Sequence, residues 1–351
     1  MRNRRKVLTI FAAAAALSLV AAACGDDDGD TTGGTGGTTG ATGTTAEITG
    51  SLTISGSSTV EPITSLVAEQ FQGLNPGVTV AVDGPGTSDG FELFCHGETD
   101  ISDASRQIEE EEVTACADNG IEPIEIEVGL DALTVIGHTG NPVECLANGD
   151  LYALFGPESE GIDTWNGADS LAKKVGGNDG FPDQALTIVA PGEESGTYDS
   201  FIDLAGIEDI ALQQGLPEDQ AATLRPDYQI SADDNVIVDN ASGTEGGLGF
   251  VGFAFATNAG DTVKLFQVDG GDGCVTPSPD TVIDGTYPLA RSLYIYVNPN
   301  KIAENPALAP FVDYYLSDEG IASVTAVQYV ALPADRLEAA RAAWESASAS
   351  A

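Results

Sequence analysis

Strand-like apolar segments alternate with helical segments along most of this chain. The run "LTIS" precedes a predicted helix over residues 63–71, "VTVAV" precedes a helix near residues 90–95, and the extended run "IEIEVGLDALTVIGH" follows. Further strands are predicted at "LTIVAP", "GGLGFVGFAFA", "VKLFQV" and "RSLYIYVNP", with helices over residues 198–204, 307–316 and 337–344. This alternation is typical of α/β units with mostly parallel strands.

Two extended runs, residues 124–137 and 289–297, are long enough to cross between two lobes. A chain that leaves one lobe and returns late builds two α/β lobes around a ligand cleft. We therefore expect a first lobe made of residues 48–135 and 288–351 and a second lobe made of residues 136–287.

The N-terminus has the pattern of an export signal. In "MRNRRKVLTIFAAAAALSLVAAAC" four basic residues precede an uncharged run that ends in small residues before Cys24. A cysteine after "VAAA" is similar to a lipobox, in which the thiol is lipid-modified; an uncleaved membrane anchor is the alternative. We predict a lipoprotein signal peptide over residues 1–23 and a flexible Gly/Thr/Asp-rich tether over residues 24–47. The mature protein is expected to be lipid-anchored through Cys24 on the outer face of the cell membrane, at the cell surface or in the periplasm.

The mature chain is strongly acidic. Removal of the signal leaves nine Lys and Arg residues against 55 Asp and Glu residues, a formal charge of −46. Nucleic acid and anionic lipid surfaces are therefore poor partners.

Four cysteines remain once Cys24 is set aside, which suits disulfides in an exported protein. Three pairings are possible. A bond between Cys95 and Cys116 closes a short local loop and leaves Cys145 to pair with Cys274. Because there is no C-x-x-C motif or Cys/His cluster, no metal site is predicted.

Hydroxyl and glycine residues cluster before three predicted helices. "GSSTVEP" contains Ser58 with Glu61 three residues later, which is a capping-box pattern, and "PGEESGTYDSF" and "DGPGTSDGF" repeat the hydroxyl-rich helix start. Ordinary helix capping or a tight turn accounts for each cluster alone. A helix N-terminus also binds anions, because its dipole and its unpaired N–H groups favour negative charge.

Arg106 in "TDISDASRQI" is the only lysine or arginine between Cys24 and Lys173. It could pair with Glu109 or Glu110 as an ordinary surface ion pair. Its guanidinium also offers a rigid fork for a tetrahedral oxyanion.

These motifs, with "SADDNVIVDNASGTEGGLGFVGFAFA" and "PLARSLYIYV", resemble the PstS-type phosphate-binding proteins of bacterial phosphate ABC importers, close to the SphX-like branch. The resemblance covers the chain from about Leu52 to the C-terminal helix. It implies a type II periplasmic-binding fold of two lobes joined by two crossover strands. It also implies capture of inorganic phosphate in the cleft and delivery to a membrane permease, by a monomer without a cofactor and without enzymatic activity.

The resemblance also assigns the phosphate-binding residues. They are Ser58, Thr59 and Val60 in the first loop, Thr87 and Ser88 in the glycine-rich turn, and Ser195, Gly196 and Thr197 in the second lobe. Many relatives carry an arginine four residues before the last loop, where this chain has Pro191. In the similar branch the arginine at the position of Arg106 takes the role of that missing arginine. Other relatives have an aspartate at this position, and it accepts the phosphate proton. We therefore expect the acceptor to be Asp89, with Asp103 as the second candidate.

Two other functions remain open from the sequence. A binding protein for sulfate, molybdate or a phosphonate would use the same hydroxyl and amide donors. A serine hydrolase or phosphatase would need a base beside the serines of "GSS" or "EESGT", and His96 and His138 belong to no recognisable triad motif.

Overall fold

The structure is a computed structural model that describes residues 48–193 and 195–349. The predicted signal peptide, Cys24 and the tether lie outside the described residues. None of the helices in the described part of the chain is both long and apolar enough to span a membrane.

The first half of the main sheet is built around a parallel core. Strand β1 (Gly50–Gly56) pairs in parallel with β2 (Val78–Asp83) and β3 (Ile101–Ala104). Helices α1 (Glu61–Leu74) and α2 (Thr87–Cys95) follow β1 and β2, and α3 (Glu110–Asp118) follows β3. Each of the first two strands therefore ends directly before a hydroxyl-rich segment that leads into a helix.

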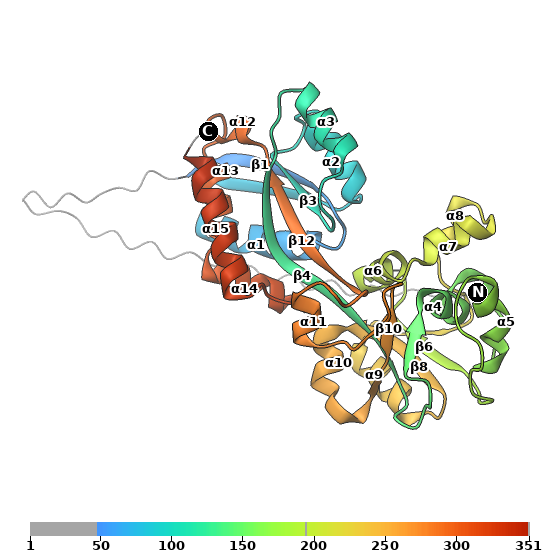
Figure 1. The fold of residues 1–351 in the computed structure, drawn as a ribbon. Helices are drawn as coiled ribbons and strands as arrows, with labels where there is room; N and C mark the ends of the chain where they lie inside the picture. The colour runs from blue at the N-terminus through green and yellow to red at the C-terminus, as the bar shows by residue number, and fades with distance from the viewer. Residues whose placement is uncertain (1–47, 194, 350–351) are drawn as a thin grey trace, which may run out of the picture. The chain divides into compact units, whose positions relative to one another are not determined.

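Two long strands run between the halves of the sheet, β4 (Ile124–Gly137) and β12 (Ala290–Val297), and they are visible side by side in Figure 1. They pair antiparallel, with a register shift between Leu293 and Tyr294. The far part of β4 pairs with β8 (Gly247–Gly252) and β9 (Lys264–Leu265). The expectation of mostly parallel strands is wrong at these two strands, because a strand that leaves one half and a strand that returns to it run in opposite directions.

The second half of the sheet contains parallel pairs beside the antiparallel pairs of β4 with β8 and β9. Strand β6 (Thr187–Ala190) pairs in parallel with β8 and with β7 (Gln229–Ile230). A separate small sheet contains β5 (Cys145–Ala147), β10 (Gln267–Asp269) and β11 (Cys274–Val275). The surrounding helices are α4 (Asn148–Phe155), α5 (Asp169–Lys174), α6 (Gly196–Leu204), α7 (Ile207–Gln214), α8 (Glu218–Ala221) and α9 (Asp234–Gly243).

The expected strand "GGLGFVGFAFA" ends earlier than predicted. Its second part forms α10 (Phe253–Ala259), in which Phe253 and Ala256 are buried. Buried residues three positions apart fit the period of a helix, whereas one face of a strand would bury residues two positions apart.

The last helices are α11 (Pro279–Ile283), α12 (Pro299–Ile302), α13 (Leu308–Tyr315), α14 (Asp318–Ala326) and α15 (Ala334–Ser348). Arg336 of α15 holds both long strands: its Nε donates to Glu127 of β4 at 3.0 Å and its Nη2 donates to Ser292 of β12 at 3.0 Å. Its Nη1 also donates to the carbonyl of Ile283 in α11 at 2.8 Å.

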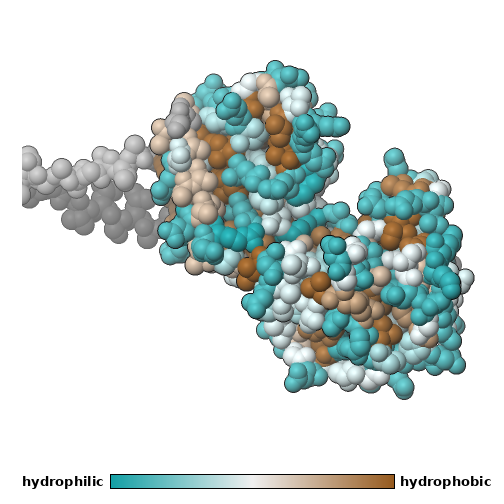
Figure 2. Space-filling model, viewed as in Figure 1, coloured by the Kyte–Doolittle hydropathy of each residue, from teal (hydrophilic) through white to brown (hydrophobic). Residues whose placement is uncertain are grey.

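Apolar side chains form two large cores, one in each half of the sheet. One contains residues such as Phe71, Phe311 and Trp344, and the other contains residues such as Tyr152, Phe201 and Phe250. Hydrophilic side chains predominate on the α2–α3 side of the hollow that faces α7 and α8 (Figure 2).

One disulfide closes a short local loop and the other joins elements that are distant along the chain. Cys95 of α2 bonds to Cys116 of α3, and Cys145 of β5 bonds to Cys274 of β11. This is the pairing that the loop lengths favour.

Candidate anion-binding site

The loop between β1 and α1 is fixed by its contact with β3. The N–H of Ser57 donates to the carbonyl of Asp103 at 2.8 Å. A Cβ at Gly56 would lie 2.0 Å from that carbonyl oxygen, and Gly56 has a φ of +150°, so only glycine fits here. The loop therefore presents Ser58 and Thr59 at a set position against the sheet.

The predicted capping box of Ser58 and Glu61 is not formed. The N–H groups of Val60 and Glu61 both donate to the carbonyl of Ser57, so a tight turn precedes α1 and the N-cap position falls on Val60. The Ser57 hydroxyl accepts from the N–H of Thr59 at 3.2 Å. The Ser58 side chain is therefore not used as a cap.

The N-terminus of α2 is tied to the end of β3. The Thr87 and Ser105 hydroxyls lie 3.1 Å apart, and the N–H of Ser105 donates to Thr87 at 3.2 Å. A Cβ at Gly90 would lie 2.4 Å from the Cα of Gly56, so this glycine allows α2 to pack closely on the first loop. Thr87 and Ser88 are thus held beside Ser58 and Thr59.

Arg106 follows β3 and is already paired. Its two terminal nitrogens donate to the carboxylate of Glu112 at 2.8 and 2.7 Å, and Nη2 also donates to Ser88 at 3.0 Å. The hydrogen bonds with Glu112 raise the pKa of Arg106 further. Of the two surface partners that the sequence suggested, Glu109 is found, with its carboxylate 3.4 Å from Nε.

A cavity of about 330 Å³ joins these groups to the second half of the molecule. Its lining includes the predicted residues Ser58, Thr59, Thr87, Ser88 and Arg106. Three carboxylates from α6 and α7 and one further arginine complete it, namely Asp199, Asp203, Glu208 and Arg291. The site therefore combines hydroxyl donors with two guanidinium groups.

Arg291 of β12 is the site residue that sequence reasoning missed. Its Nη2 donates to the hydroxyls of Thr59 and Ser200, at 3.1 Å each. Its Nε lies 3.4 Å from the buried carboxylate of Asp131, and its Nη1 pairs with Asp203. Burial raises the pKa of Asp131, and the charge of Arg291 opposes that shift. The available signal was a lone arginine at the start of a predicted crossover strand, in "PLARSLYIYV".

The loop of residues 195–197 lies next to a neighbouring cavity. Ser195 caps α6 by accepting from the N–H of Thr197 at 3.2 Å. Gly196 and Thr197 line a cavity of about 240 Å³ that also contains Asp131 and Tyr329. Since Arg291 lines the first cavity and its partner Asp131 lines the second, this ion pair lies at the boundary between them. The structure thus brings the loops that contain Ser58 and Thr87 together and places the loop that contains Ser195 beside them.

Val60 is fully buried, so the structure gives its side chain no place in the cavity lining. Any contribution of this residue to anion binding comes from its backbone.

Neither expected proton acceptor reaches the cavity. Asp89 is exposed on α2 and lies outside the cavity lining, although the neighbouring Ser88 is part of it. Asp103 is fully buried below the first loop, where its Oδ1 accepts from the Thr64 hydroxyl at 3.0 Å and its Oδ2 has no hydrogen-bond partner. Burial raises the pKa of Asp103 to about 8. Asp103 therefore belongs to the core that supports the loop.

The two histidines have local backbone contacts. His96 Nδ1 lies 2.7 Å from the carbonyl of Glu92, and His138 Nδ1 accepts from the N–H of Gly140 at 3.0 Å. Neither histidine lines the cavity that contains Ser58 and Ser88.

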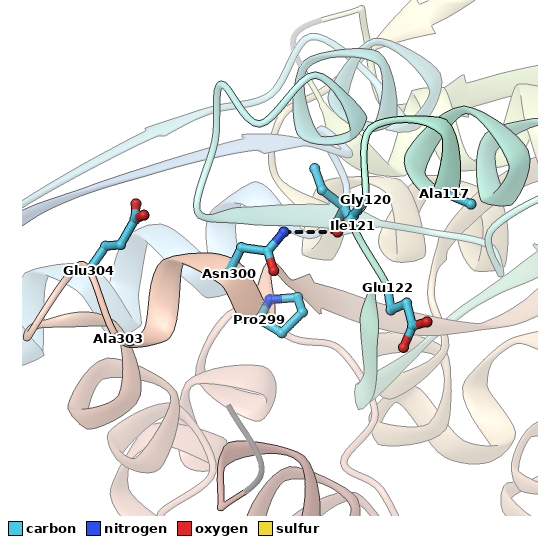
Figure 3. Close-up of a pocket in the computed structure, with 8 residues that line it drawn as sticks. All are labelled: Ala117, Gly120, Ile121, Glu122, Pro299, Asn300, Ala303 and Glu304. Carbon is cyan, nitrogen blue, oxygen red and sulfur yellow. Dashed lines mark hydrogen bonds between the residues drawn. The ribbon is translucent and has the colours of Figure 1, made fainter.

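A larger cavity of about 700 Å³ lies elsewhere, between the end of α3 and α12 (Figure 3). Asn300 donates to the carbonyl of Gly120 across it at 3.0 Å, and its charged lining residues are Glu122 and Glu304. No lysine, arginine or histidine lines this cavity, so its lining has no positive charge to attract an anion. Among residues 48–193 and 195–349, no cluster of His, Cys, Asp and Glu side chains could hold a metal ion.

Comparison with known proteins identifies a family model, related sequences and a similar solved structure. The model of a family described as a PBP superfamily domain matches residues 37–319. Protein SphX of Synechococcus elongatus is 40% identical over 292 residues, which cover 82% of this chain and 80% of that protein. The phosphate-binding protein PstS of Staphylococcus epidermidis is 30% identical over 318 residues, which cover 90% of this chain and 86% of that protein. The crystal structure of a possible phosphate-binding protein from Planctomyces limnophilus matches with a TM-score of 0.75 at 30% identity, over 86% of this chain and 99% of that one.

Proposed function

The chain belongs to the PBP superfamily and, within it, to the family of the SphX and PstS phosphate-binding proteins, and on this premise we propose that it captures inorganic phosphate outside the cytoplasm and delivers it to the permease of an ABC importer. Its fold is the mixed α/β, type II fold of that superfamily. The family consists of solute-binding proteins rather than enzymes, so we assign this chain no catalytic role.

The observation that carries the proposal is the hydroxyl-lined cavity with two arginines. Ser58, Thr59, Thr87 and Ser88 supply short, neutral donors, and Arg106 and Arg291 supply positive charge. A dehydrated tetrahedral oxyanion needs many donors, because burying an ion without hydrogen bonds is costly. Ser195, Gly196 and Thr197 would complete the donor set from the N-terminus of α6.

The proposal includes two lobes that close on the anion. The first lobe would consist of residues 48–135 and 288–351 and the second of residues 136–287. Support comes from the two separate apolar cores and from the long strands β4 and β12 that connect them.

Selection of phosphate over sulfate needs a carboxylate that accepts the phosphate proton, and we assign this role to Asp199. Asp199 lines the cavity, and its carboxylate makes no hydrogen bond or ion pair with the described residues, so it is free to accept. Burial raises its pKa, and the charge of Arg291 opposes the shift. Sulfate has no proton near neutral pH, so it would meet only repulsion there.

Titration calorimetry on phosphate-stripped protein with phosphate, arsenate, sulfate and molybdate tests the function. We expect phosphate and arsenate to bind and sulfate to bind at least about 100-fold more weakly. Tighter binding of sulfate or molybdate would instead assign the chain to another tetrahedral oxyanion. Absence of binding to all four would overturn the proposal.

The proposal also covers export and anchoring. We propose cleavage before Cys24, lipid attachment to its thiol, and a monomer held at the outer face of the membrane by the residue 24–47 tether. Mass spectrometry of the mature protein should find a diacylglycerol-bearing N-terminal cysteine. A Cys24→Ala variant should be lost from the membrane fraction, and retention of this variant in the membrane would support an uncleaved anchor.

A further inference from the structure

Arg291 uses all three guanidinium nitrogens for contacts within the protein. Nη2 bonds to Thr59 and Ser200, Nε faces Asp131, and Nη1 pairs with Asp203. An incoming anion can therefore reach this guanidinium only by sharing or replacing one of these partners.

The partners differ in how easily they can leave. Asp131 is 1% exposed on β4, and the Thr59 and Ser200 hydroxyls are buried where the first loop meets α6. The Asp203 side chain is 68% exposed, and Arg291 is its only side-chain partner among the described residues. An exposed carboxylate returns to water at little cost, since surface ion pairs contribute only about 0–1 kcal/mol.

The charge of the cavity also indicates that a carboxylate leaves Arg291 when an anion binds. Its lining holds two arginines and three carboxylates, and Arg106 is further neutralised by Glu112. A site with this balance opposes an added anion unless one carboxylate withdraws.

We infer that Asp203 is a displaceable internal anion, whose carboxylate occupies Arg291 until the bound oxyanion takes its place. This inference rests on the proposed phosphate function. Asp203 would then lower phosphate affinity and keep the buried arginine neutralised while the site is empty of phosphate.

The test compares three single variants by phosphate calorimetry. Asp203→Asn removes the internal competitor. Glu208→Gln removes a carboxylate from the same cavity that is not paired with Arg291, and Asp209→Asn removes a neighbouring charge outside the cavity. We expect Asp203→Asn to lower the phosphate Kd about three- to tenfold, the size of one surface ion pair. Glu208→Gln should lower it by a smaller factor, about twofold, because Glu208 adds to the negative charge of the cavity but does not compete for Arg291, and Asp209→Asn should leave it unchanged.

The outcomes separate the two proposals. If wild type binds phosphate and Asp203→Asn is no tighter than Glu208→Gln, the internal anion is overturned and the function stands. If Asp203→Asn weakens phosphate but not sulfate, Asp203 is the proton acceptor instead. If wild type binds no phosphate, both proposals fall.

Discussion

The hydroxyl oxygens of Thr59 and Ser200 lie 3.3 Å apart, although 141 positions separate the two residues in the chain. Thr59 belongs to the loop after β1, Ser200 belongs to α6, and Arg291 of β12 donates to both hydroxyls. One arginine on a crossover strand therefore joins the two halves of the molecule at the wall of the anion cavity.

Arg291→Ala should weaken phosphate binding by about 2–4 kcal/mol, because the anion loses a charge-assisted donor. The same change leaves the buried Asp131 carboxylate unpaired, so the free energy of unfolding should fall by about 3–5 kcal/mol. Calorimetry and urea denaturation measure the two effects. Arg291→Lys is the matched control, since it keeps the charge beside Asp131 but loses the fork. Wild-type affinity in a folded Arg291→Ala protein would confine Arg291 to a structural role.

Arg106→Ala should weaken phosphate binding by about 1–2 kcal/mol, less than Arg291→Ala, because Glu112 already neutralises much of its charge. Glu112→Gln provides the comparison: it keeps the arginine and removes the competing carboxylate, so phosphate affinity should be maintained or increased. Calorimetric titration of both variants with phosphate measures these changes in affinity. If Arg106→Ala binds phosphate like wild type, Arg106 serves only to hold α3 against the N-terminus of α2.

Asp199→Asn should narrow the preference for phosphate over sulfate by about 1–2 kcal/mol, since an amide can donate to sulfate where a carboxylate repels it. Competition titrations of the two anions measure this preference. Asp89→Asn, on the exposed face of α2, should leave it unchanged. If instead Asp89→Asn narrowed the preference and Asp199→Asn left it unchanged, Asp89 would be the proton acceptor.

Asp103 should make the protein less stable as pH rises. Burial raises its pKa from the ordinary 3.8 to about 8 in the folded protein, so between these values the unfolded chain loses a proton that the folded protein keeps. The unfolding free energy contributed by this group is therefore complete below about pH 4 and falls by up to about 1.4 kcal/mol per pH unit until about pH 8. Asp103→Asn removes this dependence. Denaturation of wild type and Asp103→Asn from pH 4 to 8 measures the free energy of unfolding of each protein. The variant should gain stability relative to wild type as the pH rises. Parallel curves would contradict the raised pKa of Asp103.

Loss of the Cys145–Cys274 disulfide should destabilise the protein more than loss of Cys95–Cys116. The bonds span 129 and 21 residues, and loop entropy alone predicts a difference of about 1.6 kcal/mol. Paired Cys→Ala variants compared by denaturation provide the measurement. Equal losses would show that packing around the buried Cys95 and Cys116 outweighs the loop term.

Much of the fold could be predicted because its signals are local. The extended runs at residues 124–137 and 289–297 became β4 and β12, since a long run of β-branched and apolar residues specifies a strand wherever it packs. The predicted strand extended past the true end of β8. The segment "FAFA" is apolar at every position, so periodicity cannot separate a buried strand from a buried helix there. The Ser58 cap was misplaced because a turn closed by Ser57 competes with it over the same residues.

By itself, the sequence determined the α/β alternation, the crossover strands, the hydroxyl-rich helix starts and the presence of Arg106 beside them, because each depends on residues within one or two turns of one another. Only the tertiary structure decided which charges meet at the cavity. Arg291, Asp131 and Asp203 come together because antiparallel pairing of β4 with β12 sets the first two opposite each other, and packing of α6 brings the third. Packing of α1 over the end of β3 buried Asp103 beside Thr64, and Asp89 stayed exposed on α2. Burial and ion pairing are properties of the space around a side chain, and residues far away in the chain create that space.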